Sequence, residues 1–408
     1  AEALEMLAGR HSEDAAGLIA FHFAEGNASE RAAPYALRAG RHAMNLAAWS
    51  EAVRFFELAL TPDMPEEQHF EVLMALGDAH YRAGHMTQAS ETLRDALRLA
   101  ENTQTTTKIC EARLALAETL LPQSRYAEAI TLAEQYPIPH DLASVVVAAR
   151  SELMIGTALS LEGAHLDLAA EYLQRGKTHL QTAKKAYPDA EIDPIYTAHL
   201  DFELGSIAAQ QGDLVQAITL YQMTLAEAQQ SHDPEAVLRT ILAHNNLAYH
   251  LHLVDDPAAA EHARTGLVLA KETGMFTLQP YLYSTSGEIA LAANDLDAAE
   301  DHFRQGLALA EQMHNLERIA GLTANLGLVA RQRGDTSLAI HRLSTALTKA
   351  DSLGTQHLAA QIRLWLAPLL PRREAQMRLS EARVIAEEGG RQLLLAEIKR
   401  LETQLSTR

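Results

Sequence analysis

Cysteine is almost absent from this chain of 408 residues, which contains only Cys110. A single thiol cannot build an internal disulfide framework, and this composition is typical of a reducing compartment such as a bacterial cytosol. We therefore expect a cytoplasmic location. Cys110 opens a predicted helix and is interpreted as a small core residue rather than as a nucleophile.

Glycine, proline and aromatic residues are scarce as well. The chain has 21 glycines and 13 prolines, and aromatics make up 5% of it, whereas hydrophobic residues reach 48% and are mostly alanine and leucine. No stretch combines enrichment in β-branched residues with the two-residue alternation of a strand. Alanine and leucine fill closely packed helix pairs, so the chain is predicted to be all-α.

Basic residues are outnumbered, with 34 lysines and arginines against 53 aspartates and glutamates and a net charge of −19. This surface would repel a polyanion, so we expect no direct nucleic-acid binding by this chain. No uninterrupted run of 18 apolar residues occurs, and no membrane-spanning segment is expected. Because the chain begins at Ala1, without an initiator methionine or a signal-peptide pattern, we expect it to be part of a longer protein.

The most informative feature that is present is a repeated pair of small residues. A glycine or alanine is followed twelve residues later by an alanine, and in most units a large residue comes four positions after that alanine. Helices pack closely only where neither side chain is bulky, so each pair predicts two packed helices. The pairs are Gly40/Ala52, Gly77/Ala89, Ala117/Ala129, Gly205/Ala217, Ala248/Ala260, Gly287/Ala299 and Gly327/Ala339, with Gly156/Ala169 carrying one extra residue.

Turn residues stand between the members of several pairs. Glycine or asparagine tolerates a left-handed backbone, and aspartate caps a following helix, so these residues predict a reversal of the chain in each unit. The expected turns contain Gly84, Gly212–Asp213, Asn294–Asp295 and Gly334–Asp335.

The repeat resembles the tetratricopeptide-repeat family in a long-period form, over about residues 32–385. The resemblance implies a right-handed superhelical solenoid of antiparallel helix pairs, with about nine repeats of roughly 40 residues. Two places depart from the pattern, at residues 187–194 and at Pro368 with Pro371. We expect three parts: a helical junction segment at 1–31, the solenoid at 32–385, and a capping helix within 386–408.

Residues 11–26 and 31–40 carry a further resemblance. They look like the junction at which a winged-helix segment gives way to a helical-repeat sensor in large bacterial signal-transduction ATPases of the STAND type. In that family the sensor follows a nucleotide-binding module and receives an inducer or a partner, and many members end in a DNA-binding or cyclase domain. The resemblance therefore implies a regulator of signal transduction or transcription.

Motifs that would indicate chemistry are weak. Gly176-Lys177-Thr178 lacks the earlier glycine of a phosphate-binding loop, because Glu171 occupies that position. His250 and His252 would point about 200° apart on a helix and could not chelate one ion. No serine stands in a nucleophile motif. We expect no cofactor, no metal site and no catalytic residue in this chain, so the fragment is predicted not to be an enzyme.

The resemblance places the binding surface on the concave face, which the first helix of each pair lines in this family. Residues two before, one after and four after the small position would point into the groove. Asn246 and Asn325 occupy the place where peptide-binding members carry an asparagine for the ligand backbone, although such asparagines can also bond a neighbouring helix or water. The candidates are Phe202, Glu203, Ser206, Asn245, Asn246, Tyr249, His252, Tyr281, Ser284, Thr285, Glu288, Asn325 and Arg331.

Two functions from different classes remain open at this stage. The first is a non-catalytic sensor that binds a protein, a peptide or a small-molecule inducer in the groove. The alternative is a scaffold or self-assembling array that senses no ligand. A repeat-supported hydrolase is a distant third.

Overall fold

The computed structural model describes residues 2, 4–5, 13–46, 48–62, 64–136, 141–162, 165–388 and 391–406. These residues form helices, turns and connecting segments, and no strand occurs among them. The chain divides into two compact units, Ala1–Ile192 and Asp193–Arg408, called here the N-terminal and the C-terminal unit. The all-α prediction is confirmed. Part of the expected junction segment, at residues 6–12, lies outside the described residues.

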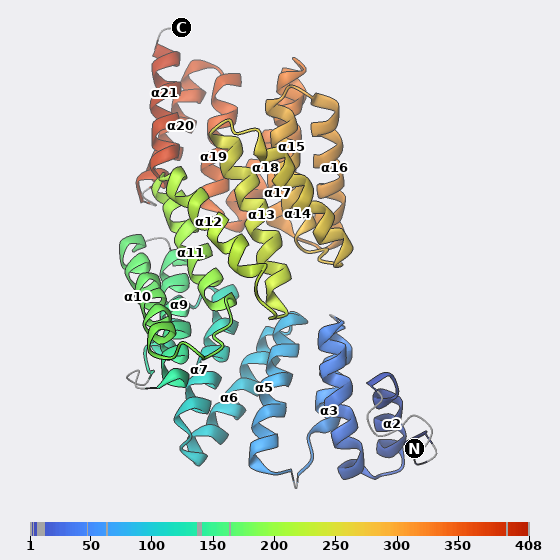
Figure 1. Ribbon diagram of the computed structural model, residues 1–408. Helices are drawn as coiled ribbons and strands as arrows, with labels where there is room; N and C mark the ends of the chain where they lie inside the picture. The colour runs from blue at the N-terminus through green and yellow to red at the C-terminus, as the bar shows by residue number, and fades with distance from the viewer. Residues whose placement is uncertain are drawn as a thin grey trace. The chain divides into compact units, whose positions relative to one another are not determined.

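The N-terminal unit is a succession of helices in which each packs against the next (Figure 1). A leading helix, α2, packs against α3, and four helix pairs follow: α3 with α4, α5 with α6, α7 with α8, and α9 with α10. The helices are α2 (Glu13–Glu25), α3 (Ser29–Asn45), α4 (Trp49–Ala59), α5 (Glu66–Arg82), α6 (Met86–Thr103), α7 (Thr106–Leu120), α8 (Tyr126–Ala133), α9 (Leu142–Glu162) and α10 (Leu166–Ala186).

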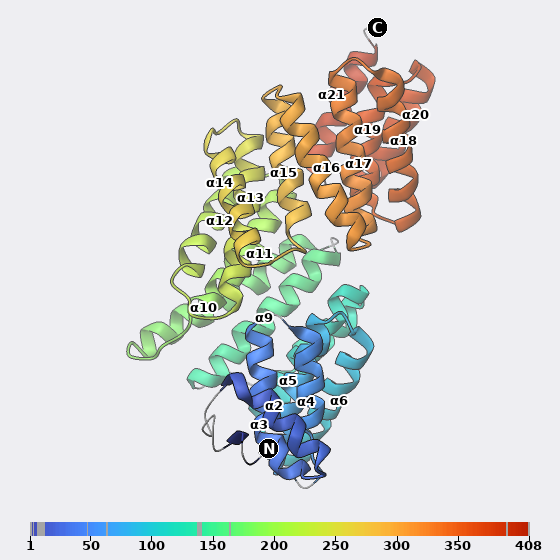
Figure 2. The same cartoon turned by 90° about the vertical axis from the view of Figure 1, so that its right-hand side faces the viewer.

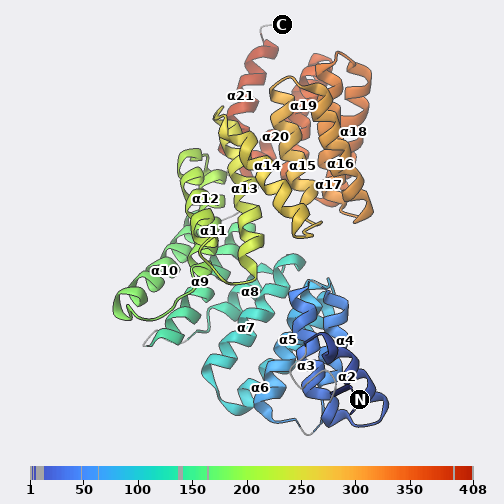
Figure 3. The ribbon, with the colours of Figure 1, turned by 45° about the vertical axis from the view of Figure 1, so that its right-hand side comes forward.

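The C-terminal unit contains five further pairs and a closing helix (Figure 2). With the four earlier pairs, the described residues contain the nine predicted units. The pairs are α11 (Ile195–Gln211) with α12 (Leu214–Ala228), α13 (Glu235–Leu253) with α14 (Ala258–Glu272), α15 (Gln279–Ala292) with α16 (Leu296–Gln312), α17 (Leu316–Gln332) with α18 (Thr336–Leu353), and α19 (Gln356–Leu366) with α20 (Arg372–Glu388). The closing helix, α21 (Gln392–Ser406), packs against α19 and α20 (Figure 3).

The first helix of a pair needs a small residue where a large side chain of the partner helix lies directly over that position. A Cβ atom added to Gly77 would lie 2.5 Å from Leu93, and one added to Gly205 would lie 2.9 Å from the Tyr221 ring. In each case the large side chain comes sixteen residues later, on the partner helix, and is buried. The same overlap recurs at Gly40 with Phe56, Gly156 with Leu173, Gly287 with Phe303 and Gly327 with Leu343.

The turns follow the predicted chemistry. Gly84, Gly212 and Gly334 have φ values of +80°, +88° and +83°, and Asn294 has a φ of +61°. The carboxylates of the aspartates that follow accept a backbone N–H three residues on, which caps the next helix. The pairs are Asp213 with Gln216 at 3.0 Å, Asp295 with Ala298 at 3.1 Å, and Asp335 with Leu338 at 2.9 Å.

Both predicted irregular joints are present. Residues 187–194 form turns and extended chain between α10 and α11, and the boundary between the two compact units falls inside this segment. At the other joint α19 ends at Leu366 and a 3-10 turn, Ala367–Leu369, contains Pro368. Proline removes a backbone donor and obstructs the preceding turn, so the helix of the last pair is shortened there.

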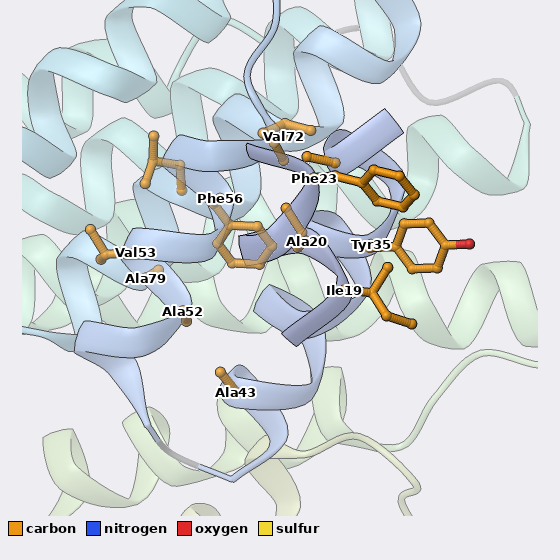
Figure 4. Packing of buried hydrophobic residues seen from close by; sticks show 14 residues of the cluster. Ile19, Ala20, Phe23, Tyr35, Ala43, Ala52, Val53, Phe56, Val72 and Ala79 are labelled. Atoms are coloured by element: carbon orange, nitrogen blue, oxygen red, sulfur yellow. The ribbon is translucent and has the colours of Figure 1, made fainter. Parts of the chain in front are cut away.

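The apolar core of the N-terminal unit begins at its first helices. Ile19 and Phe23 of α2 pack with Tyr35 of α3, and the Phe23 and Tyr35 rings stack with centroids 5.9 Å apart (Figure 4). Phe56 of α4 is 1% exposed and packs in the same cluster with Val72 of α5. Burial of this apolar surface fixes α2 as part of the unit.

One described helix, α9, is long and apolar enough to cross a membrane, in contrast to the expectation from uninterrupted runs. It was missed because charged residues interrupt the run, although the mean hydropathy of an 18-residue window still reaches 1.5. Of that window, 61% is buried inside the protein. Near its middle, the buried Glu152 accepts a hydrogen bond from Tyr136 and lies 3.3 Å from Arg175. Core helices of soluble proteins have the same properties, so this helix is weak evidence for a membrane span.

Candidate binding groove

A cavity of about 620 Å³ opens on one face of the C-terminal unit. Its walls come from the first helices of four successive pairs, α13, α15, α17 and α19, together with Glu397 of α21. These helices are neighbours in space because α13 packs against α15, α15 against α17, and α17 against α19. The small residues that let each pair close up therefore also bring the same face of successive first helices together.

Most of the predicted groove residues lie around this one cavity. Three exceptions lie on α11 away from it: Phe202, Glu203 and Ser206. Ser284 is part of the lining. The nine predicted residues of the lining, besides Ser284, are Asn245, Asn246, Tyr249, His252, Tyr281, Thr285, Glu288, Asn325 and Arg331.

Sequence reasoning missed the part of the wall that comes from α19 and α21. The register rule depended on a small residue at position 367, where the prolines replace the helix by a 3-10 turn. A usable signal was present: His357, Gln361 and Trp365 are spaced by four and share one face of α19. Glu397 lies outside the repeat, on α21. Arg318 of α17 also lines the cavity, about two turns earlier than the rule allowed.

A polar network links α15 to α17 at the base of the cavity. The Nδ2 atom of Asn325 lies 3.1 Å from Ser284 Oγ and 3.0 Å from Glu288 Oε1, and Ser284 donates to the same carboxylate at 3.0 Å. Asn325 is only 3% exposed. Its amide nitrogen thus donates hydrogen bonds within the protein. This is the alternative in which the asparagine bonds a neighbouring helix rather than a ligand backbone.

A second link joins α13 to α15. Thr285 donates a hydrogen bond of 3.0 Å to Asn245 Oδ1, and Asn245 Nδ2 lies 3.4 Å from Asn246 Oδ1. Asn245 and Asn246 are half-buried, and both line the cavity.

Burial shifts the pKa values of several residues that line the cavity. It raises the pKa of Glu288, against the opposing effect of the hydrogen bonds from Asn325 and Ser284. It raises the pKa of Tyr249 to about 12, and it lowers the pKa of Arg331. Each shift disfavours the charged form, as expected where water is partly excluded.

Aromatic rings supply the apolar part of the wall. Tyr249 and Tyr281 remain 39% and 38% exposed, which leaves flat ring surface available to a ligand. The Arg318 guanidinium lies 4.5 Å from the centroid of the Tyr281 ring and 3.1 Å from Glu317 Oε1. Arg318 and the Tyr281 ring therefore line the cavity in contact with each other.

A smaller apolar chamber of about 420 Å³ adjoins the cavity. It shares Asn245, Asn246 and Tyr281 with the larger one, so these three residues stand at the junction of the two. Its other lining residues are Ile241, Leu242, Thr277, Leu278, Leu282 and Asn315. Together the two chambers form the groove referred to below.

Comparison with solved structures identifies the architecture. A signal-transduction ATPase with numerous domains and a tetratricopeptide repeat sensor, from Pyrococcus horikoshii, matches 88% of this chain with a TM-score of 0.55 and 14% identity. The fold is that of a tetratricopeptide-repeat array. This chain spans 55% of the length of that ATPase. No protein-family model and no curated protein matches the chain.

Two other arrays of known structure are similar. A Rap protein complexed with competence and sporulation factor matches 83% of this chain and 99% of its own, with a TM-score of 0.56 and 13% identity. The Rap conjugation gene regulator of the plasmid pLS20, in complex with the Phr* peptide, matches 85% of this chain and 98% of its own, with a TM-score of 0.50 and 12% identity. Identities this low establish the shared fold and nothing beyond it.

The predicted residues Phe202 and Glu203 belong to a separate cluster of the array. The Arg239 guanidinium of α13 lies 4.7 Å from the centroid of the Phe202 ring of α11. Burial raises the pKa of Glu203 and lowers the pKa of Arg239, and each opposes the shift of the other. This cluster joins two first helices and does not line the groove.

Gly176 and Cys110, whose residue types could have indicated chemistry, are buried in helices of the array. Gly176 is buried inside α10, and Cys110 is 3% exposed in α7, where burial raises the pKa of its thiol. Within the described ranges, no group of three or more histidine, cysteine, aspartate or glutamate side chains is arranged to hold a metal ion.

A histidine pair between α13 and α14 predicts a dependence of stability on pH. His244 is 8% exposed, its Nδ1 lies 3.0 Å from Nδ1 of His262, and burial followed by the neighbouring His262 lowers its pKa from 6.5 to about 4. Between these values the unfolded chain binds a proton that the folded chain does not. The contribution of His244 to the free energy of unfolding should therefore be fully present above pH 6.5, and it should fall as the pH decreases towards 4.

Urea unfolding of His244→Gln between neutral pH and pH 4 would test this. Removing one titrating group should reduce the slope of the free energy of unfolding against pH by no more than about 1.4 kcal/mol per pH unit. His232→Gln, at an exposed position, is the control and should keep the parent slope. An unchanged slope in His244→Gln would show that another group is responsible.

Proposed function

We propose that this chain is a non-catalytic binding module whose groove in the C-terminal unit holds an extended peptide segment of a partner. The observation that carries the proposal is the cavity of about 620 Å³, in which amide, aromatic and charged side chains from four successive first helices converge. Concave sites with a few placed polar groups and exposed rings are typical ligand sites.

A peptide suits the groove better than a compact ligand because the site has two joined chambers. Asn245 and Asn246 stand where the chambers meet, and an amide can donate to and accept from a peptide backbone. The similar Rap structures were determined with competence and sporulation factor and with the Phr* peptide. These structures support the proposal by analogy of fold.

We further propose that the module is the sensor of a cytoplasmic STAND-type ATPase or transcription regulator, in which groove occupancy biases the state of a nucleotide-binding module. The similarity to the Pyrococcus horikoshii ATPase supports this role. Sequencing the gene upstream of the codon for Ala1 would test it, with a phosphate-binding loop expected there. A complete reading frame without such a loop would refute this part of the proposal and leave the groove assignment intact.

Selection of short random peptides on the purified chain would test the groove directly. Selected peptides should bind with one-to-one stoichiometry in calorimetry, and a variant with Tyr249→Ser should bind at least about tenfold more weakly. The control carries Val268→Ser, at an exposed position on α14 outside the groove. Equal binding to both variants would show that the groove is not the site.

A further inference from the structure

Glu288 is one of two carboxylates that line the larger chamber, the other being Glu397 of α21. Glu288 stands on α15, half-buried, with Tyr249 of α13 and Tyr281 of its own helix in the same lining. Its Oε1 atom accepts hydrogen bonds from two neutral donors, Ser284 and Asn325. These donors fix the carboxylate in position but do not neutralise it.

No cationic side chain among the described residues forms an ion pair with Glu288. The two arginines that line the chamber make their hydrogen bonds with other groups, and Arg318, with His252, acts on Glu288 only through a longer-range attraction, which opposes the rise in its pKa that burial causes. Arg318 covers the Tyr281 ring and bonds Glu317, whereas Arg331 Nη1 lies 3.4 Å from the backbone oxygen of Trp365. A partly desolvated carboxylate with neutral donors only is an incomplete arrangement, because buried charges in proteins are normally paired.

We propose that Glu288 recognises a protonated lysine or arginine side chain of the bound peptide, while the adjoining apolar chamber takes an apolar side chain of the same peptide. This inference rests on the proposed function and specifies the class of ligand. An ammonium or guanidinium group would complete the ion pair, and the neighbouring tyrosine rings attract cations through their π faces.

The arrangement of the chambers limits the spacing of the two side chains. Both chambers share Asn245, Asn246 and Tyr281, so a peptide whose backbone passes these residues reaches both at once. An extended peptide advances by about 3.3 Å per residue, with successive side chains on opposite faces. The apolar residue is therefore expected within about two positions of the basic one.

The burial of Glu288 also makes the pairing selective. Its pKa is raised by burial, so the ionised form is held at a cost that a cationic ligand would relieve. An acidic ligand side chain would increase that cost, and a neutral one would leave it unchanged. The larger chamber should thus discriminate by charge, whereas the apolar chamber should discriminate by size.

Sequencing of the peptides selected from the random library provides the first readout. Lysine or arginine should be enriched in the binders, with leucine, isoleucine, valine, methionine or phenylalanine within two positions. Changing that basic residue to norleucine, which is apolar and of similar length, should weaken binding to the parent chain about 10- to 100-fold.

Glu288→Gln provides the second readout, because glutamine keeps the shape and removes the charge. In this variant the basic and the norleucine peptides should bind with affinities within about threefold of each other, which is a coupling that a general folding defect would not produce. The matched control is Glu203→Gln, a half-buried glutamate of α11 outside the groove, in which the full preference should persist.

The outcomes separate this inference from the proposed function. Peptides that bind the groove without basic enrichment, or with a preference that Glu288→Gln leaves intact, would overturn the inference and leave the groove assignment standing. If no selected peptide is sensitive to Tyr249→Ser, both fail together. Enrichment of acidic residues in the selected peptides would also overturn the inference, because it would show that the chamber prefers an anionic side chain.

Discussion

Replacing Gly287 with alanine is expected to lower the free energy of unfolding of the C-terminal unit by about 2–3 kcal/mol. The added methyl group would overlap the ring of Phe303, which is fully buried on the partner helix α16. The ring cannot withdraw into solvent, so the two helices must separate or the ring must leave its rotamer. Urea unfolding followed by circular dichroism would measure the loss.

Two variants isolate the cause of that effect. Gly321→Ala, on α17, places a methyl group where no atom lies within 4 Å, and it should stabilise the helix by about 0.5–1 kcal/mol. Combining Gly287→Ala with Phe303→Leu should cost less than the sum of the two single changes, because the smaller side chain makes room. Additive losses would show that overlap with the ring is not the reason for the glycine.

Tyr136→Phe is expected to lower the stability of the N-terminal unit by about 2–3 kcal/mol. The Tyr136 hydroxyl donates to the carboxylate of Glu152, which is 1% exposed in the middle of α9. Burial and the nearby Glu152 together raise the pKa of this hydroxyl, so it remains a donor. Two other groups approach this carboxylate: Arg175, whose side chain is 54% exposed, at 3.3 Å, and His179 Nε2 at 4.0 Å. At these distances and exposures they compensate only partly.

Tyr126→Phe is the matched control for this change. The Tyr126 hydroxyl lies 3.5 Å from Ser124 Oγ in an exposed turn, so its removal should cost less than about 0.5 kcal/mol. Thermal and denaturant unfolding of both variants would make the comparison. A Tyr136→Phe protein as stable as the control would mean that Glu152 is satisfied by other groups.

The groove shows how far the register of the repeat can be carried. Asn246, Tyr249 and His252 could be placed from the sequence because they stand two before, one after and four after Ala248, whose position is set by helix packing. The same rule selected Glu203 and Ser206 on α11, where the cavity does not extend. A periodic pattern assigns a face to a helix, but it does not tell which stretch of that face is hollow.

The nine helix pairs, their turns and the two irregular joints were determined by the sequence alone. Small residues at a fixed spacing admit only close helix pairs, and glycine, asparagine and proline act locally on the backbone. The tertiary structure decided what those pairs enclose. It engaged Asn325 in a network with Glu288, and it brought Trp365 and Glu397 to the groove from helices outside the regular register. These contacts depend on distances between separate helices, which no local pattern contains.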